Sequence, residues 1–83
     1  MNTILTALVQ INPTVGALED NAKIIAESAE KAVALGARIL VFPELCLSGY
    51  PPEDLVLKPH FVRRCREQLE ALLPLLPPGA VSI

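Results

Sequence analysis

Apolar positions in this chain change their spacing several times, and each change predicts a secondary-structure element. Apolar residues nearly fill positions 4–11, which predicts a strand buried on both faces. Residues 18–35 carry apolar side chains on one stripe at helical spacing, and Gly36 follows them where a left-handed helix cap is expected. Residues 38–42, in which four apolar residues follow Arg38, predict a second strand. Strand, helix and strand in this order are typical of a βαβ unit with parallel strands.

The second half of the chain predicts two more helices and part of a third strand. A loop is expected over 44–52, and a short helix from Pro52 to Leu55. A longer helix is expected over 59–73, ended by Pro74. Residues 80–83 are typical of the first residues of a strand. Because a strand cut in mid-pairing is unfavourable, we expect these residues to be the amino-terminal piece of a longer α/β protein, truncated within its third strand.

Composition narrows the class of protein. The 83 residues are 52% hydrophobic and 19% charged, with a formal net charge of −2. This apolar content suits part of a larger core or an oligomer better than a free-standing small domain. The slight acidity favours neither nucleic acid nor an anionic membrane, and no apolar run approaches the ~18–20 residues of a membrane span. Two cysteines without a CxxC motif, and no signal peptide, indicate the cytoplasm.

Candidate chemistry begins at Glu44. The apolar run that follows Arg38 stops at Pro43, and the next residue is this carboxylate. In open α/β folds, the carboxyl ends of the strands are where ligands and catalysis are found. A carboxylate held there can act as a general base. The alternative is a strand-end acid that caps the following turn or pairs with an arginine.

Other reactive side chains have simpler interpretations. Cys46 lies beyond the turn expected at Pro43, so it is a poor partner for Glu44 and is expected to be a small buried hydrophobe. Cys65 falls on the apolar stripe of its helix. His60 has no second ligand at metal-binding spacing, which predicts no metal site. Tyr50 either covers the loop or lines a pocket beside Glu44.

Several segments resemble the beginning of nitrilase-superfamily sequences. They are Gln10-Ile11-Asn12-Pro13-Thr14-Val15-Gly16, Asn21, Gly36-Ala37 and Val41-Phe42-Pro43-Glu44-Leu45. The segment from Leu47 to Leu55, LSGYPPEDL, is similar to one branch, the glutamine-dependent NAD⁺ synthetases. The resemblance implies a nitrilase-type α-β-β-α sandwich that pairs with another subunit in a homo-oligomer. Residues 1–83 would be the amino-terminal portion of its carbon-nitrogen hydrolase, or glutaminase, domain.

The same resemblance implies an amidase site with a Glu–Lys–Cys triad. Glu44 matches the general base, and Tyr50 is implied as a residue of the glutamine pocket. The triad lysine and cysteine lie beyond Ile83 in this family, so the 83-residue piece alone is expected to be inactive. Ammonia would pass to a synthetase domain of the same chain, which uses ATP and Mg²⁺ to amidate nicotinic acid adenine dinucleotide to NAD⁺. No cofactor or metal is expected in residues 1–83.

Ala17 departs from the family pattern, because many relatives have an aspartate there that could cap the helix. Loss of such a cap costs about 0.5–2 kcal/mol of helix stability.

Two other hypotheses about function remain open from the sequence. One is a stand-alone nitrilase-type amidase or carbamoylase. The other is a non-enzymatic α/β module, if the chain is naturally complete.

Overall fold

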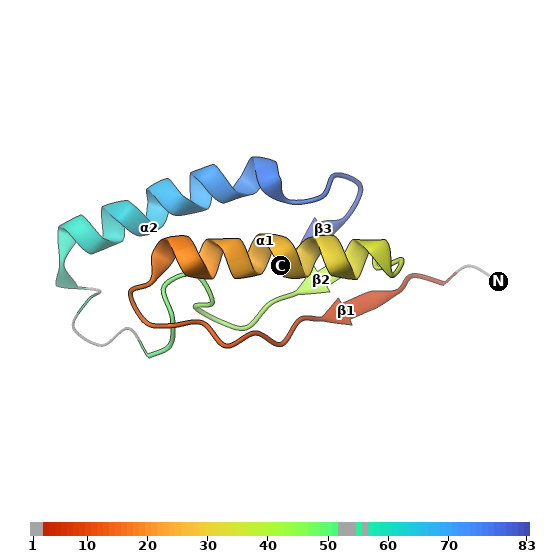
Figure 1. Ribbon diagram of the computed structural model, residues 1–83, viewed down its shortest axis with the longest axis horizontal. Helices are drawn as coiled ribbons and strands as arrows, with labels where there is room; N and C mark the ends of the chain where they lie inside the picture. Colours follow the sequence, from red (N-terminus) through yellow and green to blue (C-terminus); the bar gives the residue numbers. More distant parts are fainter. Residues whose placement is uncertain (1–2, 52–54, 56) are drawn as a thin grey trace.

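The computed structural model of the protein describes residues 3–51, 55 and 57–83. They form an α/β structure around a parallel sheet of three strands in the order β1-β2-β3 (Figure 1). In chain order the elements are β1 (Thr6–Leu8), α1 (Leu18–Ala34), β2 (Ile39–Val41), α2 (Pro59–Leu72), the 3₁₀ helix η2 (Leu73–Leu75) and β3 (Val81–Ser82). The predicted α/β class, the parallel βαβ unit and the third strand are confirmed. The predicted short helix from Pro52 to Leu55 lies largely outside the described residues.

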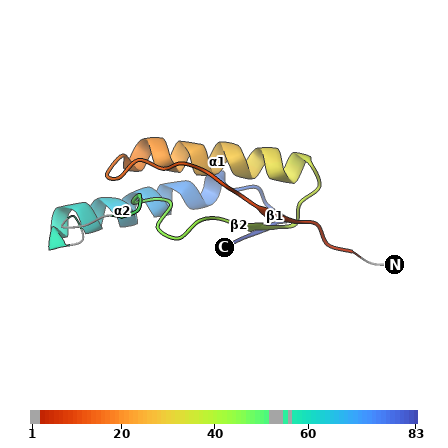
Figure 2. The same ribbon diagram turned by 90° about the horizontal axis from the view of Figure 1, so that it is seen from below.

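The core lies between the sheet and α1. Ala29 of α1 packs against Ala37 and Leu40, and all three side chains are almost completely buried. Figure 2 shows both helices on the same side of the sheet, with α2 alongside α1. Burial of a leucine such as Leu40 contributes about 1.5–3 kcal/mol to stability. Small alanines on the apolar stripe of α1 let the helix approach the sheet closely.

The opposite face of the sheet is open among the described residues, which corrects one prediction. The first strand was expected to span 4–11 and to be buried on both faces. Instead β1 covers only Thr6–Leu8, and its Leu8 side chain is 76% exposed. Val81 of β3 is also exposed on this sheet. The apolar run was read correctly as a strand, but hydrophobicity alone did not reveal which face α1 would cover.

Helix α1 ends as predicted but begins without a side-chain cap. Gly36 has a φ of 98°, and its N–H donates to the carbonyl of Val33 at 2.9 Å. The N–H of Ala37 reaches the carbonyl of Ala32 at 3.1 Å, which completes a Schellman motif. At the other end, the N-cap residue Ala17 makes no side-chain hydrogen bond to the helix. Its absent cap affects the start of the helix and not the chemistry at the sheet edge.

No helix among the described residues has the length and apolar character needed to cross a bilayer.

Candidate functional site

Glu44 lies at the carboxyl edge of the sheet, where the sequence placed it. Pairing between β2 and β3 extends to Phe42, whose N–H donates to the carbonyl of Ile83 at 2.8 Å. Pro43 comes next and has no N–H with which to continue a ladder. Glu44 then begins a turn and is exposed to solvent. Within the part of the chain that is described, its carboxylate makes no ion pair and no side-chain hydrogen bond. The alternative of a turn-capping or arginine-paired acid is therefore not supported there.

The backbone reverses immediately after Glu44. Leu45 has a φ of 56°, in the left-handed region that non-glycine residues rarely adopt. The carbonyl of Leu45 accepts a hydrogen bond from the N–H of Gly49 at 2.8 Å and closes the turn. We call residues 44–49 the Glu44 turn. Because the strand does not continue, Cys46 does not follow Glu44 along an extended chain, as Pro43 predicted.

A cavity of about 460 Å³ opens beside Glu44. Its walls come from α1, the two residues that follow β2, the Glu44 turn, α2, η2 and the end of the chain at β3, and they are mostly apolar. Among the described residues that line it, Glu44 is the one that carries a charge. A cavity of a few hundred Å³ with apolar walls and few polar groups is typical of small-molecule sites. This cavity is the candidate functional site.

The structure separates the other predicted site residue, Tyr50, from this cavity. The Tyr50 side chain is 67% exposed and does not line the cavity that Glu44 lines. Its role in binding glutamine stays a prediction. His60 is exposed near the start of α2. No group of three or more metal-ligating side chains gathers among the residues described here.

Both cysteines are partly buried thiols. Cys46, Cys65 and Phe61 line a neighbouring apolar cavity of about 500 Å³ between the Glu44 turn and α2. Burial raises the pKa of the Cys46 thiol, and the backbone N–H groups of Cys46 and Leu47 offset part of the rise. Burial also raises the pKa of Cys65. A raised pKa keeps both thiols protonated near neutral pH, which agrees with packing roles and not with activated nucleophiles.

Alkylation of Cys46 is expected to be slow at neutral pH and to accelerate only above the ordinary thiol pKa. Burial disfavours the thiolate in the folded state alone, so the folded protein holds this proton to higher pH than the unfolded chain. The same difference lowers the stability of the fold as the pH rises past the ordinary thiol pKa. The rate of iodoacetamide labelling against pH, in a Cys65→Ser variant of the chain, measures the shift. The matched control is the same variant in denaturant, and a lower midpoint in the folded protein would contradict the assignment.

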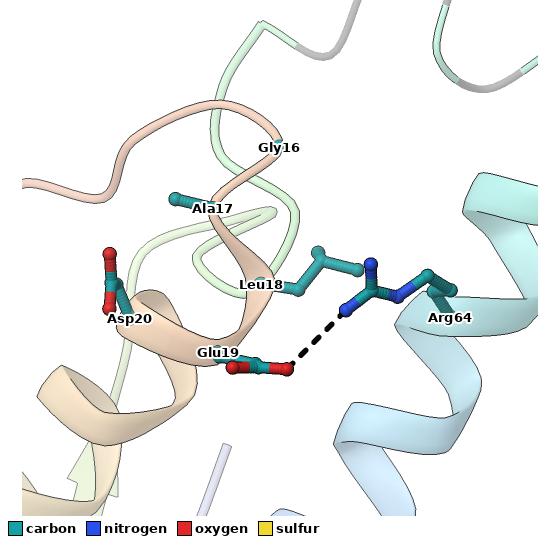
Figure 3. Close-up of a pocket in the computed structure, with 6 residues that line it drawn as sticks. All are labelled: Gly16, Ala17, Leu18, Glu19, Asp20 and Arg64. Carbon is teal, nitrogen blue, oxygen red and sulfur yellow. Dashed lines mark ion pairs between the residues drawn. The ribbon is translucent and has the colours of Figure 1, made fainter.

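A third hollow, of about 330 Å³, lies at the start of α1 (Figure 3). Its lining residues are Gly16, Ala17, Leu18, Glu19, Asp20 and Arg64. Arg64 reaches across from α2, and its Nη2 lies 3.5 Å from Glu19 Oε1. Both side chains are largely exposed, so the pair contributes at most about 1 kcal/mol. The hollow holds an exposed ion pair between the two helices, so we assign it no chemistry.

Arg64 and its neighbours Arg63 and Arg66 form a cluster of basic residues on α2, and such clusters are usually solvated. Arg66 fits that interpretation, because its Nε lies 3.2 Å from Glu70 Oε1 one helical turn away, on the exposed surface. The contact of Arg64 with Glu19 was not predicted. The contact joins two helices that are distant in the sequence. The spacing of residues within α2 cannot predict a contact with another helix.

Asn21 was named in the family resemblance, but the pattern of apolar residues gave it no role. It lies in the first turns of α1, and its side chain is completely buried. Its Nδ2 donates to the carbonyl oxygens of Thr14 and Leu47, both at 2.8 Å, and its Oδ1 accepts from the N–H of Thr14 at 2.9 Å. Leaving one such buried group without its partner costs about 1–3 kcal/mol. One signal was available: Asn21, Ile25 and Ala29 share the buried stripe of α1, where an amide is out of place.

The described residues thus form an α/β structure with the carboxylate of Glu44 at the carboxyl edge of a parallel sheet. Residues 5–76 match the family model of the carbon-nitrogen hydrolases, and the chain belongs to this family. The match supports a nitrilase-type fold. In such an α-β-β-α sandwich, the open face of the sheet is the face that meets a second sheet.

Individual relatives agree with this assignment. The chain is 50% identical over 73 residues to a glutamine-dependent NAD(+) synthetase of Synechocystis sp., a match that covers 88% of the chain. It is 46% identical over 70 residues to proteins of the same name from Aquifex aeolicus and Thermotoga maritima, with 80% and 84% of the chain covered. The chain spans only 12–13% of the length of these three relatives.

Proposed function

We propose that residues 1–83 are the amino-terminal part of the glutaminase domain of a glutamine-dependent NAD⁺ synthetase. The observation that carries the proposal is the 36–50% identity, over most of this chain, to proteins that share this name. The hypothesis of a stand-alone amidase is less well supported, because the eight curated relatives all carry the synthetase name.

In this proposal Glu44 is the general base for hydrolysis of the glutamine side-chain amide. It takes the proton of a cysteine thiol supplied by a part of the protein outside residues 1–83. The thiolate attacks the amide carbon, ammonia leaves, and water hydrolyses the resulting thioester to glutamate. A lysine, also from outside these residues, stabilises the developing oxyanion. The support within this chain is the position of Glu44, which lacks an ion-pair partner among the described residues and lines an apolar cavity.

The remaining parts of the proposal concern the complete gene product. Ammonia passes to a synthetase domain of the same chain, where ATP and Mg²⁺ drive amidation of nicotinic acid adenine dinucleotide. Tyr50 is proposed to contact glutamine once the rest of the domain surrounds it. We also propose a cytoplasmic protein that forms a homo-oligomer. Sheet residues such as Leu8 and Val81 leave an apolar face for further layers to cover.

The complete gene product is expected to make NAD⁺ from nicotinic acid adenine dinucleotide, ATP and Mg²⁺ with either glutamine or ammonium as the nitrogen source. The 83-residue piece alone is expected to release no ammonia from glutamine, because it holds the proposed base without its nucleophile. Coupled assays of NAD⁺ and ammonia measure both outcomes. Glutamine hydrolysis without any NAD⁺ formation would instead indicate a stand-alone amidase. Ammonia release by the isolated piece would contradict the assigned triad.

A further inference from the structure

The Glu44 turn is attached to the rest of the structure at three consecutive residues. The side chain of Asn21 donates to the carbonyl oxygen of Leu47 at 2.8 Å. The N–H of Gly16 donates to the carbonyl of Ser48 at 2.9 Å. Gly49 is buried, and a Cβ built on it would lie 2.4 Å from the Cα of Val15. These contacts join the turn to α1 and to the loop between β1 and α1.

Asn21 differs from the other two attachments because it belongs to a helix. Its Nδ2 holds both loops at once, through Leu47 on the Glu44 turn and Thr14 on the preceding loop. Its Oδ1 is also engaged, by the N–H of Thr14 at 2.9 Å. The amide is thus locked in one orientation, and a side chain with no exposed surface cannot exchange these partners for water. Asn21 therefore fixes the position of the Glu44 turn relative to α1.

The turn needs such support. Leu45, the residue next to Glu44, has a φ of 56°, an unfavourable conformation for a residue with a side chain. Backbone conformations of this kind persist only where surrounding contacts enforce them. Within the turn, the N–H of Gly49 donates to the carbonyl of Leu45, so one hydrogen bond holds the strained residue itself. Loss of the external bond at Leu47 would let the turn relax toward an ordinary conformation and displace the Glu44 carboxylate.

We propose that Asn21 is a positioning residue for Glu44, which holds the carboxylate at the cavity through its hydrogen bond to Leu47. The inference rests on the proposed glutaminase function. A general base acts only within hydrogen-bond reach of the proton it removes, and small misplacements reduce the rate strongly. Asn21 affects only the hydrolysis of the glutamine amide. NAD⁺ synthesis from ammonia therefore does not depend on Asn21.

The test compares Asn21→Asp with wild type in the complete gene product. Aspartate keeps the shape and one acceptor but lacks the two N–H donors that reach Thr14 and Leu47. We expect kcat for glutamine-driven NAD⁺ synthesis to fall by about 10–100-fold, as for a displaced base, with KM for glutamine and the ammonia-driven rate nearly unchanged. Asn21→Ser, which is neutral and too short to span both carbonyl groups, is expected to show the same selective loss. It carries the test if the aspartate variant does not fold.

Ala29→Gly is the matched control for stability. Ala29 is equally buried on α1 but packs on the core of the sheet, away from the Glu44 turn. This variant is expected to lower the melting temperature and leave the ratio of glutamine-driven to ammonia-driven rates unchanged. If the Asn21 variants keep the wild-type ratio of glutamine-driven to ammonia-driven rates, whether or not both rates fall, Asn21 is structural only and the inference fails. A wild-type protein without glutamine-driven synthesis would overturn the proposed function itself, and the inference with it.

Discussion

The Glu44→Gln variant of the complete gene product is expected to lose glutamine-driven NAD⁺ synthesis by about 10²–10⁴-fold, the usual contribution of a general base. The amide that replaces the carboxylate has nearly the same shape but cannot accept the thiol proton. Synthesis from ammonium is expected to stay at the wild-type rate, because externally supplied ammonia bypasses the glutaminase step. Initial rates of NAD⁺ formation with each nitrogen source measure the two activities separately.

Glu30→Gln is the matched control for this substitution. Glu30 is an exposed residue of α1, outside the cavity that Glu44 lines, so the same chemical change is expected to alter neither activity. Equal loss of glutamine-driven and ammonia-driven synthesis in Glu44→Gln would place Glu44 in the fold or in the coupling between domains. Full activity with glutamine would exclude it as the base.

The Gly49→Ala variant is expected to be the most destabilising single-methyl change in the described part of the chain. Gly49 has a φ of 85°, and an added Cβ would lie 2.4 Å from the Cα of Val15 and 2.6 Å from its N. The left-handed backbone alone costs an alanine about 1–2 kcal/mol. Overpacking against fixed backbone adds about 1–3 kcal/mol. Because the displaced segment is the Glu44 turn, glutamine-driven synthesis is expected to fall together with the melting temperature.

Gly79→Ala separates the two causes. Gly79 has nearly the same φ, 84°, but a Cβ there would meet no atom within 4 Å. Its variant is therefore expected to show the conformational cost alone, with glutamine-driven synthesis unaffected. Thermal unfolding of both variants, followed by calorimetry, gives the comparison. Equal shifts in melting temperature would mean that the contact between Gly49 and Val15 contributes nothing.

Much of the fold could be predicted because local sequence and tertiary structure agree. The spacing of apolar residues in α1 and the position of Gly36 define a helix whose buried stripe and cap were both recognised. The length and burial of β1 could not be predicted in the same way. Leu8 is as hydrophobic as a core residue, yet the described residues leave it exposed. Sequence shows that such a side chain favours burial, but not which layer buries it.

The candidate site was predictable in part for the same reason. Pro43 marks the end of β2, so the position of Glu44 follows from local rules about strands and proline. The left-handed conformation of Leu45 and the role of Asn21 depend on contacts between segments distant in the sequence. The bond from Asn21 to Leu47 joins residues 26 positions apart, and only the folded structure brings them together. A polar residue on a buried helical stripe was the available sign.

An isotope competition tests the central claim, that the carboxamide nitrogen of NAD⁺ comes from glutamine through hydrolysis in which Glu44 is the general base. The complete gene product is supplied with glutamine labelled with ¹⁵N in its side-chain amide and with unlabelled ammonium, and the carboxamide of the NAD⁺ formed is analysed by mass spectrometry. The account predicts ¹⁵N in the carboxamide of the NAD⁺ made by the wild-type protein, and no ¹⁵N above natural abundance in that made by Glu44→Gln. Undiminished transfer of ¹⁵N by Glu44→Gln would contradict it.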